Sequence, residues 1–291
     1  MFPAQKEYFN WVSIHGGHSG EFCLHANDTL EQIIQAYINK NCLWVGITEH
    51  VPPISNSFRY DDEIEAGLTQ QTLFERFAHY IRHCRDLQKK YRSILPIYVG
   101  FETETYTGYG HHISSLRQTF QPDYIVGSVH HVNDINFDFS IKHYHEAIKN
   151  AGNIDHLYCA YFDTQWEMIN VIQPEVVGHF DLIRIYDPDY QNRMLSSNIF
   201  KRIIRNLELI HRYDIILDLN VRALEKGATE PYITRSILKT AIDMGITIMP
   251  GDDSHSVLTV GRHIDKGIQQ LINLGYTLNW NPPFTSKLKC F

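Results

Sequence analysis

The chain has 291 residues, of which 43% are hydrophobic and 20% charged. No linker, low-complexity tract or charge block interrupts it, so we predict that residues 1–291 form one α/β domain. The formal charge of −7 at pH 7 gives no general attraction for nucleic acid or an anionic membrane. Without a long apolar run or a signal-like start, we expect a cytoplasmic protein that acts on a small molecule.

Short apolar segments typical of strands alternate with helix-like segments along the chain. The first strand is expected from Phe9 to Ile14, and a helix from about Thr29 to Lys40 follows a capping-box pattern at Asp28 to Glu31. Further strands are expected at residues 43–48, 95–101, 123–129, 175–178, 214–219 and 246–250. Further helices are expected up to residue 91, at 140–172 with a break near Gly152, at 192–212 and at 234–244. This alternation indicates parallel strands joined by crossover connections.

Polar side chains follow nearly every predicted strand. The first strand runs into three histidines, and the others run mainly into histidine, glutamate or aspartate. In a (β/α) barrel the carboxyl ends of all strands meet on one face, whereas an open doubly wound sheet spreads them along a line. We therefore predict a barrel similar to a TIM barrel, with a metal site at the carboxyl ends of its strands.

Nine strand-end side chains are candidate metal ligands: His15, His18, His25, His50, Glu102, His130, His179, Asp253 and His255. Because a catalytic zinc takes about three protein ligands, this set predicts two or three divalent ions with bridging carboxylates. The five cysteines are scattered and form no Cys-x-x-Cys pair, so no cysteine ligand is expected and zinc, iron and manganese stay open. The neighbouring Glu49, Glu104 and Asp181 are expected to orient the ligands.

Two arginines lie close to strand ends, Arg184 after the strand at 175–178 and Arg222 after the strand at 214–219. A planar guanidinium matches the oxygens of a phosphate group by paired hydrogen bonds. These two residues are therefore predicted to bind substrate, and phosphate-ester hydrolysis fits the site.

The strand-end motifs together resemble the PHP superfamily, and within it the histidinol-phosphate phosphatase branch. The motifs are His18-Ser19-Gly20-Glu21-Phe22-Cys23-Leu24-His25, Gly46-Ile47-Thr48-Glu49-His50, Gly100-Phe101-Glu102, Ser128-Val129-His130, Gly178-His179-Phe180-Asp181 and Gly251-Asp252-Asp253-Ser254-His255. The resemblance implies a distorted (β/α)7 barrel with a trinuclear metal site, in which the candidate histidines from His18 onward, Glu102 and Asp253 are ligands. It also implies that Arg184 and, less directly, Arg222 hold phosphate.

The first motif departs from the family pattern. The family opens with His-x-His, which requires a histidine at position 16, but Gly16 stands there and His15 precedes it. The flexible pair Gly16 and Gly17 gives the backbone the freedom to bring His15 to the ion instead.

The expected activity is hydrolysis of L-histidinol phosphate to L-histidinol and phosphate in histidine biosynthesis, with Asp253 and His255 taking part at the leaving alkoxide. One alternative is a PHP phosphoesterase acting on another phosphomonoester or a nucleotide. A second is a barrel amidohydrolase with a metal pair, and a third, disfavoured one is a non-catalytic metal-binding protein. Candidates for recognising the imidazole and ammonium groups are Glu104, Tyr106 and the loop 54–68, while the tail from Tyr276 is expected to cap the barrel.

Overall fold

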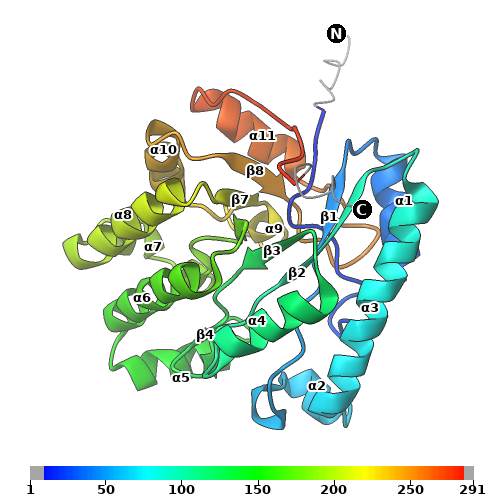
Figure 1. Ribbon diagram of the computed structural model, residues 1–291. Coiled ribbons are helices and arrows are strands. Elements are labelled where there is room, and N and C mark those ends of the chain that lie inside the picture. Colours follow the sequence, from blue (N-terminus) through cyan, green and yellow to red (C-terminus); the bar gives the residue numbers. More distant parts are fainter. Residues whose placement is uncertain (1–9, 285–291) are drawn as a thin grey trace.

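The computed structural model describes residues 10–284. Its main sheet has six strands in the order β1-β2-β3-β6-β7-β8, and every neighbouring pair is parallel. The strands are β1 (Val45–Ile47), β2 (Ile97–Glu102), β3 (Tyr124–Gly127), β6 (Val176–Val177), β7 (Ile216–Asn220) and β8 (Ile248–Gly251). Figure 1 shows the sheet at the centre of the molecule, with helices around it.

The segment after Asn10 closes this sheet into a barrel. Ser13 forms a parallel bridge with Val45 of β1, and the amide of Ile14 donates to the carbonyl of Pro250 in β8 over 2.9 Å. The strand expected from Phe9 to Ile14 is thus a single bridged residue with irregular backbone around it, and Phe9 lies outside the described residues. With this segment as the seventh, the expected distorted (β/α)7 barrel is confirmed.

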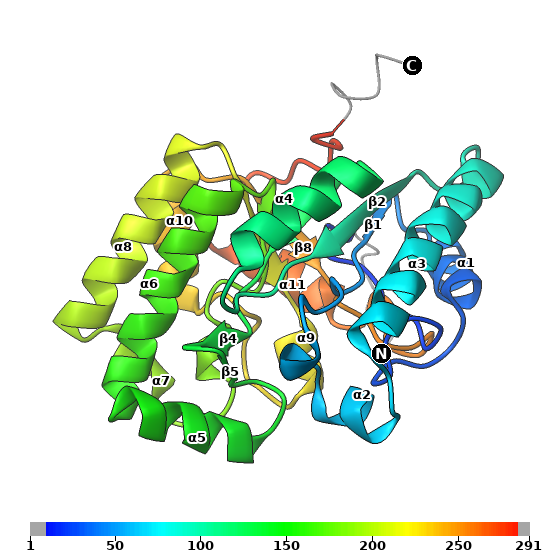
Figure 2. The ribbon, with the colours of Figure 1, turned by 60° about the horizontal axis from the view of Figure 1, so that its bottom comes forward.

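Long helices surround the sheet, and shorter elements lie at one end of it (Figure 2). The long helices are α1 (Leu30–Asn39), α3 (Gln70–Tyr91), α4 (Tyr109–Phe120), α5 (Ile141–Ala151), α6 (Ile154–Ile172), α8 (Ser197–Arg212), α10 (Arg235–Asp243) and α11 (Ile264–Asn273). The short elements are α2 (Asp61–Glu65), α7 (Tyr190–Met194), α9 (Arg222–Glu225), the 3₁₀ turns η1 (Asn56–Phe58) and η2 (Leu182–Arg184), and the hairpin of β4 (His131–Val132) and β5 (Ile135–Asn136).

Local capping explains where several helices begin. The predicted break near Gly152 is confirmed, because Gly152 adopts a φ of +93° and the Asn153 side chain then caps α6. The capping box of α1 lies one residue later than expected, between Thr29 and Gln32. The helix expected at 192–212 begins only at Ser197, after the separate short helix α7.

Aromatic residues fill the amino-terminal end of the barrel. The ring of Tyr124, at the start of β3, stacks on Phe284 with centroids 4.3 Å apart, and its hydroxyl donates to the carbonyl of Ile14 over 2.6 Å. Trp280 donates from its indole nitrogen to the carbonyl of Asn10 over 2.8 Å. The expected terminal cap is therefore confirmed as far as Phe284, at the end opposite the polar strand ends, while residues 285–291, with Cys290, lie outside the described residues.

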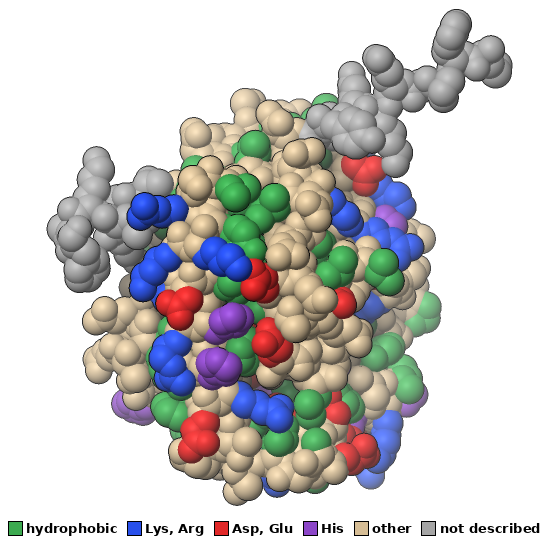
Figure 3. Space-filling view, turned by 90° about the vertical axis from the view of Figure 1, so that its right-hand side faces the viewer, with side chains coloured by type: hydrophobic (Ala, Val, Ile, Leu, Met, Phe, Trp, Pro, Cys, Tyr) green, Lys and Arg blue, Asp and Glu red, His purple; other side chains and the backbone are tan. Residues whose placement is uncertain are grey.

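The outer surface is mixed in character. Over α1 and α3, Lys and Arg side chains are interspersed with Asp and Glu rather than gathered in a patch of one sign (Figure 3). Among the helices of residues 10–284, none combines the length and the apolar character that a membrane crossing requires.

Candidate metal centre

Polar side chains from the strand ends converge at the carboxyl end of the barrel, as the sequence predicts. Four overlapping groups bring potential metal ligand atoms within 4.8 Å of one another. The groups are His18, Cys23, His50 and His255; His15, Glu102 and His179; His15, His18 and Asp253; and His50, Glu102 and His130. Eight of the nine predicted ligands therefore meet in these groups, and His25 is the exception.

Glu102, the last residue of β2, lies at the middle of the cluster and is 1% exposed. Its Oε2 is 3.2 Å from Nε2 of His15 and 3.3 Å from Nδ1 of His50, and its Oε1 is 2.8 Å from Nε2 of His179 and 3.1 Å from Nε2 of His130. Burial alone would raise the pKa of Glu102, but the adjacent His15, His130 and His50 hold it well below its usual value. An ionised carboxylate facing imidazoles on both oxygens can bridge two cations.

His18 and Asp253 form the neighbouring part of the cluster. Nε2 of His18 lies 3.3 Å from Oδ1 of Asp253, and its Nδ1 lies 3.3 Å from Oε2 of Glu49. The second oxygen of Glu49 accepts a hydrogen bond from the amide of Ser19 over 2.7 Å. Burial lowers the pKa of His18, but the adjacent carboxylates of Asp253 and Glu49 outweigh it and raise the pKa to about 9. Glu49 thus contacts a candidate ligand on the side away from the cluster centre.

Several ring nitrogens in the cluster lack a hydrogen-bond partner. These buried atoms are His15 Nε2, His18 Nε2, His50 Nδ1 and His179 Nδ1. A buried polar atom without a partner is costly. Three of these four atoms, all except His179 Nδ1, lie 3.2–3.3 Å from a carboxylate oxygen of Glu102 or Asp253. This donor set suits divalent ions such as zinc, iron or manganese.

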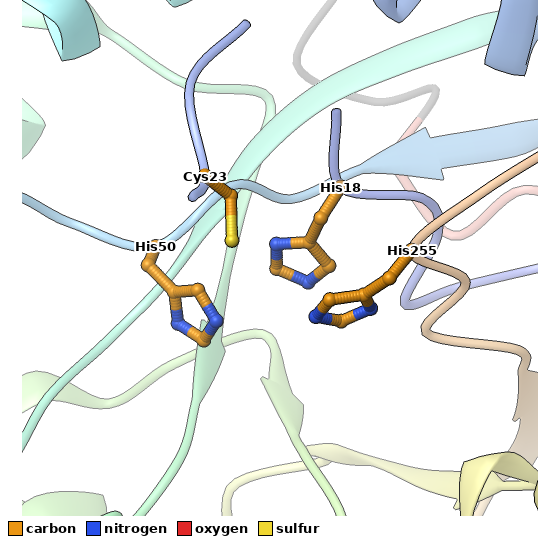
Figure 4. Close-up of side chains that lie close together, drawn as sticks. All are labelled: His18, Cys23, His50 and His255. Atoms are coloured by element: carbon orange, nitrogen blue, oxygen red, sulfur yellow. The ribbon is translucent and has the colours of Figure 1, made fainter. Parts of the chain in front are cut away.

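Cys23 reaches the cluster although no cysteine ligand was expected. Its thiol points toward the rings of His18, His50 and His255 (Figure 4), and the residue is 8% exposed. The only signal in the sequence is its place two residues before His25. Burial raises the pKa of the Cys23 thiol well above its usual value, and the charge of Glu49 adds to this rise.

His25 lies at the mouth of the same group rather than inside it. Its side chain is 37% exposed, and its ring centroid is 5.2 Å from that of His255 and 5.7 Å from that of His50. Its Nδ1 is 3.7 Å from Oδ2 of Asp62 on α2. Burial lowers the pKa of His25, which favours the neutral imidazole that binds metals.

The cluster opens into a cavity of about 190 Å³. Its lining includes Arg222 and Lys226 on one wall and Tyr60, Asp138 and Phe139 on others. Lys226 was not singled out in the sequence, although it follows Arg222 by one helical turn, the spacing that places two side chains on one face. The cavity thus combines metal ligands with two cationic side chains.

Arg184, which the sequence predicts to bind substrate, is not among the residues that line this cavity. It is 4% exposed, and its Nη2 donates to the carbonyls of Glu230 and Pro231 over 3.1 and 2.6 Å. Its guanidinium also lies over the rings of Tyr190 and Tyr232, at 4.8 and 4.7 Å from their centroids. The 3₁₀ turn η2 directly follows the strand-end motif that contains His179, and it places the Arg184 side chain between Tyr190 and Tyr232.

The three acidic neighbours of the candidate ligands have different partners. Glu49 contacts His18, as described above, and Glu104 lies 3.5 Å from Nδ1 of His50. Asp181 instead accepts a hydrogen bond from the amide of Thr234 over 2.7 Å. The expected orienting contact is therefore present for Glu49 and Glu104, whereas Asp181 joins two loops.

A second, smaller cavity of about 40 Å³ adjoins the first, and both are lined by His25, His50 and Tyr60. Acidic side chains dominate its polar lining, which includes Asp62, Glu63 and Glu104 beside the single cation Arg76. The Tyr60 hydroxyl donates to Glu104 over 2.5 Å. Burial, with a contribution from the charge of Asp62, raises the pKa of Glu63 to about 7.

Comparison with known proteins adds the family context. The model of the PHP domain matches residues 16–222 of the chain. A Schizosaccharomyces pombe protein named "Probable histidinol-phosphatase" is 33% identical over 270 residues, which cover 91% of this chain and 87% of that protein. The histidinol-phosphatase of Saccharomyces cerevisiae is 27% identical over 296 residues, covering 89% of this chain and 88% of that protein.

Solved structures share the fold. A protein of Listeria monocytogenes superposes with a TM-score of 0.78 at 24% identity, over 88% of this chain and 99% of that one. The histidinol phosphate phosphatase of Lactococcus lactis, solved with zinc, L-histidinol and phosphate, superposes with a TM-score of 0.70 at 17% identity, over 92% of this chain and 95% of that one. The barrel is therefore common to all three chains.

Proposed function

Because the chain belongs to the PHP domain family, we propose that its strand-end cluster is the metal centre of a histidinol-phosphatase. The reaction is hydrolysis of L-histidinol phosphate to L-histidinol and phosphate, a step of histidine biosynthesis. The relatives that carry this activity in their names match most of the chain. The observation that carries the proposal is the cavity in which a nitrogen and carboxylate cluster faces the two cations Arg222 and Lys226.

Two or three divalent ions are proposed for the centre. The four ligand groups overlap at His15, His18, His50 and Glu102, so neighbouring ions would share Glu102, and His25 is kept as a proposed ligand beside His50 and His255. Bound ions of this kind lower the pKa of a water molecule to make a nucleophile at neutral pH and neutralise phosphoryl oxygens.

Arg222 and Lys226 are proposed to hold the phosphoryl group. Nη1 of Arg222 donates to the carbonyl of Asp253 over 2.9 Å, which fixes the guanidinium beside the cluster and leaves its other donors for substrate. Lys226 adds a point charge on the same wall. An amide substrate has no use for such a pair, so the lining favours phosphate over the amidohydrolase alternative.

Asp253 and His255 have proton states that define what they can do. Burial disfavours the charged form of Asp253, but His15, His18 and Arg222 hold its pKa well below its usual value. Asp253 is therefore an ionised hydrogen-bond acceptor that orients water. Nδ1 of His255 lies 2.9 Å from the carbonyl of Asp253; as that oxygen only accepts, Nδ1 carries the hydrogen and Nε2 keeps a lone pair. The leaving alkoxide then takes its proton from water.

The acidic cavity is proposed to receive the amine end of the substrate. Asp62 supplies negative charge for an ammonium group, and a bound ammonium would favour the ionised form of Glu63, whose pKa is otherwise raised to about 7. Phe58 stacks on Tyr106 at 4.4 Å in the same lining. An aromatic wall next to carboxylates suits a cationic group and an imidazole ring.

The test is phosphate release from L-histidinol phosphate, compared with 4-nitrophenyl phosphate and adenosine monophosphate, on protein with quantified metal content. We expect preference for histidinol phosphate, with activity lost on chelation and restored by metal. Activity confined to the other esters would discard the substrate, and inactivity of metal-loaded protein on every ester would discard the function.

Variants of α2 sharpen this test. Glu63→Gln should raise KM for histidinol phosphate and leave 4-nitrophenyl phosphate hydrolysis unchanged, because the latter has no ammonium group. Asp62→Asn should also raise KM for histidinol phosphate, and its metal content is measured alongside because Asp62 lies 3.7 Å from Nδ1 of His25. Asp61→Asn is the matched control, since the Asp61 side chain is 52% exposed and lies 3.5 Å from His143, outside the lining of both cavities. Equal KM values for all three variants would remove the amine subsite from the proposal.

A further inference from the structure

We propose that Asp218 is a positioning residue, which holds His15 as a metal ligand in place of the histidine that Gly16 does not supply. The inference rests on the proposed metal centre. Asp218 lies within β7, two residues before the strand end at Asn220. A search of the sequence for polar residues at strand ends therefore does not identify Asp218.

The contact between the two side chains sets the proton on the imidazole. Nδ1 of His15 lies 2.9 Å from Oδ2 of Asp218, and neither side chain is exposed. A carboxylate only accepts hydrogen bonds, so Nδ1 carries the hydrogen. Nε2, which lies 3.2 Å from Oε2 of Glu102 and has no hydrogen-bond partner, then presents its lone pair to the cluster. Carboxylates behind metal-binding histidines act in this way in many proteins.

Asp218 is itself held in place by two further donors. Its Oδ2 accepts from the amide of His179 over 3.3 Å and from Nδ2 of Asn220 over 3.1 Å. Asn220 also reaches Oδ2 of Asp253 over 3.3 Å. Asp218 thus connects His15 to the backbone of His179 and, through the side-chain amide of Asn220, to Asp253. His179 and Asp253 are both proposed ligands.

Gly251, the last residue of β8, leaves the space for this pair. A Cβ atom at Gly251 would lie 2.1 Å from Oδ1 of Asp218 and 2.8 Å from Cβ of His15. The His15 ring and the Asp218 carboxylate therefore fit only because Gly251 has no side chain.

Position 16 cannot supply the ligand on this backbone. A Cβ atom at Gly16 would lie 2.2 Å from the carbonyl oxygen of Gly46 and 2.8 Å from Cγ2 of Val45, distances that no real side chain shows. The backbone at Gly16 packs directly on β1, and the preceding residue turns its ring to the cluster. His15, rather than a side chain at position 16, is thus the proposed ligand here.

The experiment compares metal binding by the whole protein with and without the carboxylate. In Asp218→Asn, the amide can donate as well as accept, so the His15 tautomer is no longer imposed. We expect metal affinity, measured by competition with a chelator, to fall by about 10- to 100-fold. Asp187→Asn is the control, because Asp187 is a buried carboxylate that contacts Tyr158 and Arg193, outside the cluster. It should keep metal affinity even if it melts at a lower temperature.

A double-mutant cycle tests whether Asp218 affects metal binding through His15. If Asp218 acts through His15, then His15→Ala and the double variant His15→Ala/Asp218→Asn should bind metal equally weakly. Additive losses, or wild-type affinity in Asp218→Asn, would overturn the inference. A wild-type protein that binds no divalent metal would instead overturn the proposed function.

A measurement on the unmodified protein covers the case in which Asp218→Asn does not fold. Nitrogen-15 NMR of the zinc-loaded wild type should show the His15 ring with hydrogen on Nδ1 and zinc on Nε2. Hydrogen on Nε2 would contradict the role of Asp218 directly.

Discussion

Nε2 of His179 lies 2.8 Å from Oε1 of Glu102, although the two residues are 77 positions apart in the chain. His179 follows β6 and Glu102 ends β2, and β3 lies between these strands in the sheet. The contact therefore spans three neighbouring strand ends, which only the curvature of the sheet brings together. The carboxylate is the point at which the histidines of the cluster meet.

Replacing this carboxylate should empty more than one ion site. Glu102→Gln removes the negative charge that faces four imidazoles, so we expect loss of bound metal and a fall in kcat of more than about 100-fold, beyond the effect of removing an outer partner. Metal analysis and steady-state kinetics check this. Glu31→Gln, on the surface pair with Lys90, serves as the control, and a Glu102→Gln enzyme with full metal and near-normal turnover would refute the central role.

Cys23 and His25 compete for the same position, and we expect His25 to bind the ion. The neutral imidazole gives up no proton, because burial lowers the pKa of His25, whereas the thiol must lose a proton that burial holds strongly. His25→Ala should therefore lose metal and Cys23→Ser should keep it. Cobalt-substituted protein gives a second readout: a thiolate-to-cobalt charge-transfer band that disappears in Cys23→Ser would reverse this assignment.

The cationic wall should control phosphate binding. Arg222→Met or Lys226→Met each removes a charged donor from the cavity, so the inhibition constant of inorganic phosphate should rise by about tenfold or more. Arg184→Lys should instead lower the melting temperature and leave that constant unchanged, since Arg184 bonds to the carbonyls of Glu230 and Pro231. The reverse pattern would return the phosphate role to Arg184.

Metal binding should release protons. In the metal-free protein the pKa of His18 is raised to about 9, so this ring is protonated at about pH 7.5 and an ion must displace the proton. We expect metal affinity to rise with pH toward 9. Calorimetric titrations in two buffers of different ionisation heat measure the protons released, and identical heats in both buffers would contradict the expectation.

The same shift affects the stability of the metal-free protein in the opposite direction. Because the folded-state pKa of His18 is raised from 6.5 to about 9, its contribution is fully present below pH 6.5 and is lost as pH rises through about 9. Thermal melts over this window should show declining stability without metal. His18→Gln should remove this part of the decline.

Most members of the candidate metal cluster were predictable because their positions depend on strand order alone. Parallel strands in a barrel all point their carboxyl ends to one face, so a histidine that directly follows a strand, such as His50 or His179, must lie there. Even β6, with only two residues in strand geometry, delivers its histidine. The cluster could be anticipated without knowing any loop.

The residues that sequence reasoning missed, and the expected position of Arg184, depend on how loops turn. Arg184 also follows a strand closely, but η2 turns it into the slot between Tyr190 and Tyr232. Cys23 reaches the cluster through the turn that precedes His25, and Lys226 through the short helix α9. No periodic pattern in the sequence predicts how these loops turn, so the positions of Cys23, Arg184 and Lys226 are known only from the structure.

Two long helices were missed because their starts carry no capping signal. The helix α4 follows Gly108 at a φ of +89° without a side-chain cap, and only Ile113 and Leu116 are buried along it. The helix α11 follows His263 at a φ of +67°, also without a side-chain cap. In α4, where neither a cap nor an apolar stripe is strong, tertiary packing decides the helix, whereas α11 buries Ile264, Ile268 and Leu271 at helical spacing and lacks only the cap.

The closure of the barrel bears on how the protein is made. The segment at Ser13 and Ile14 pairs on one side with β1 and on the other with Pro250 of β8, so one of its neighbours is synthesised almost at once and the other more than 200 residues later. A domain generally folds as a unit during synthesis. His15 and His18 must therefore wait for their partners Asp218 and Asp253, and the candidate metal centre can form only after Asp253 has been synthesised.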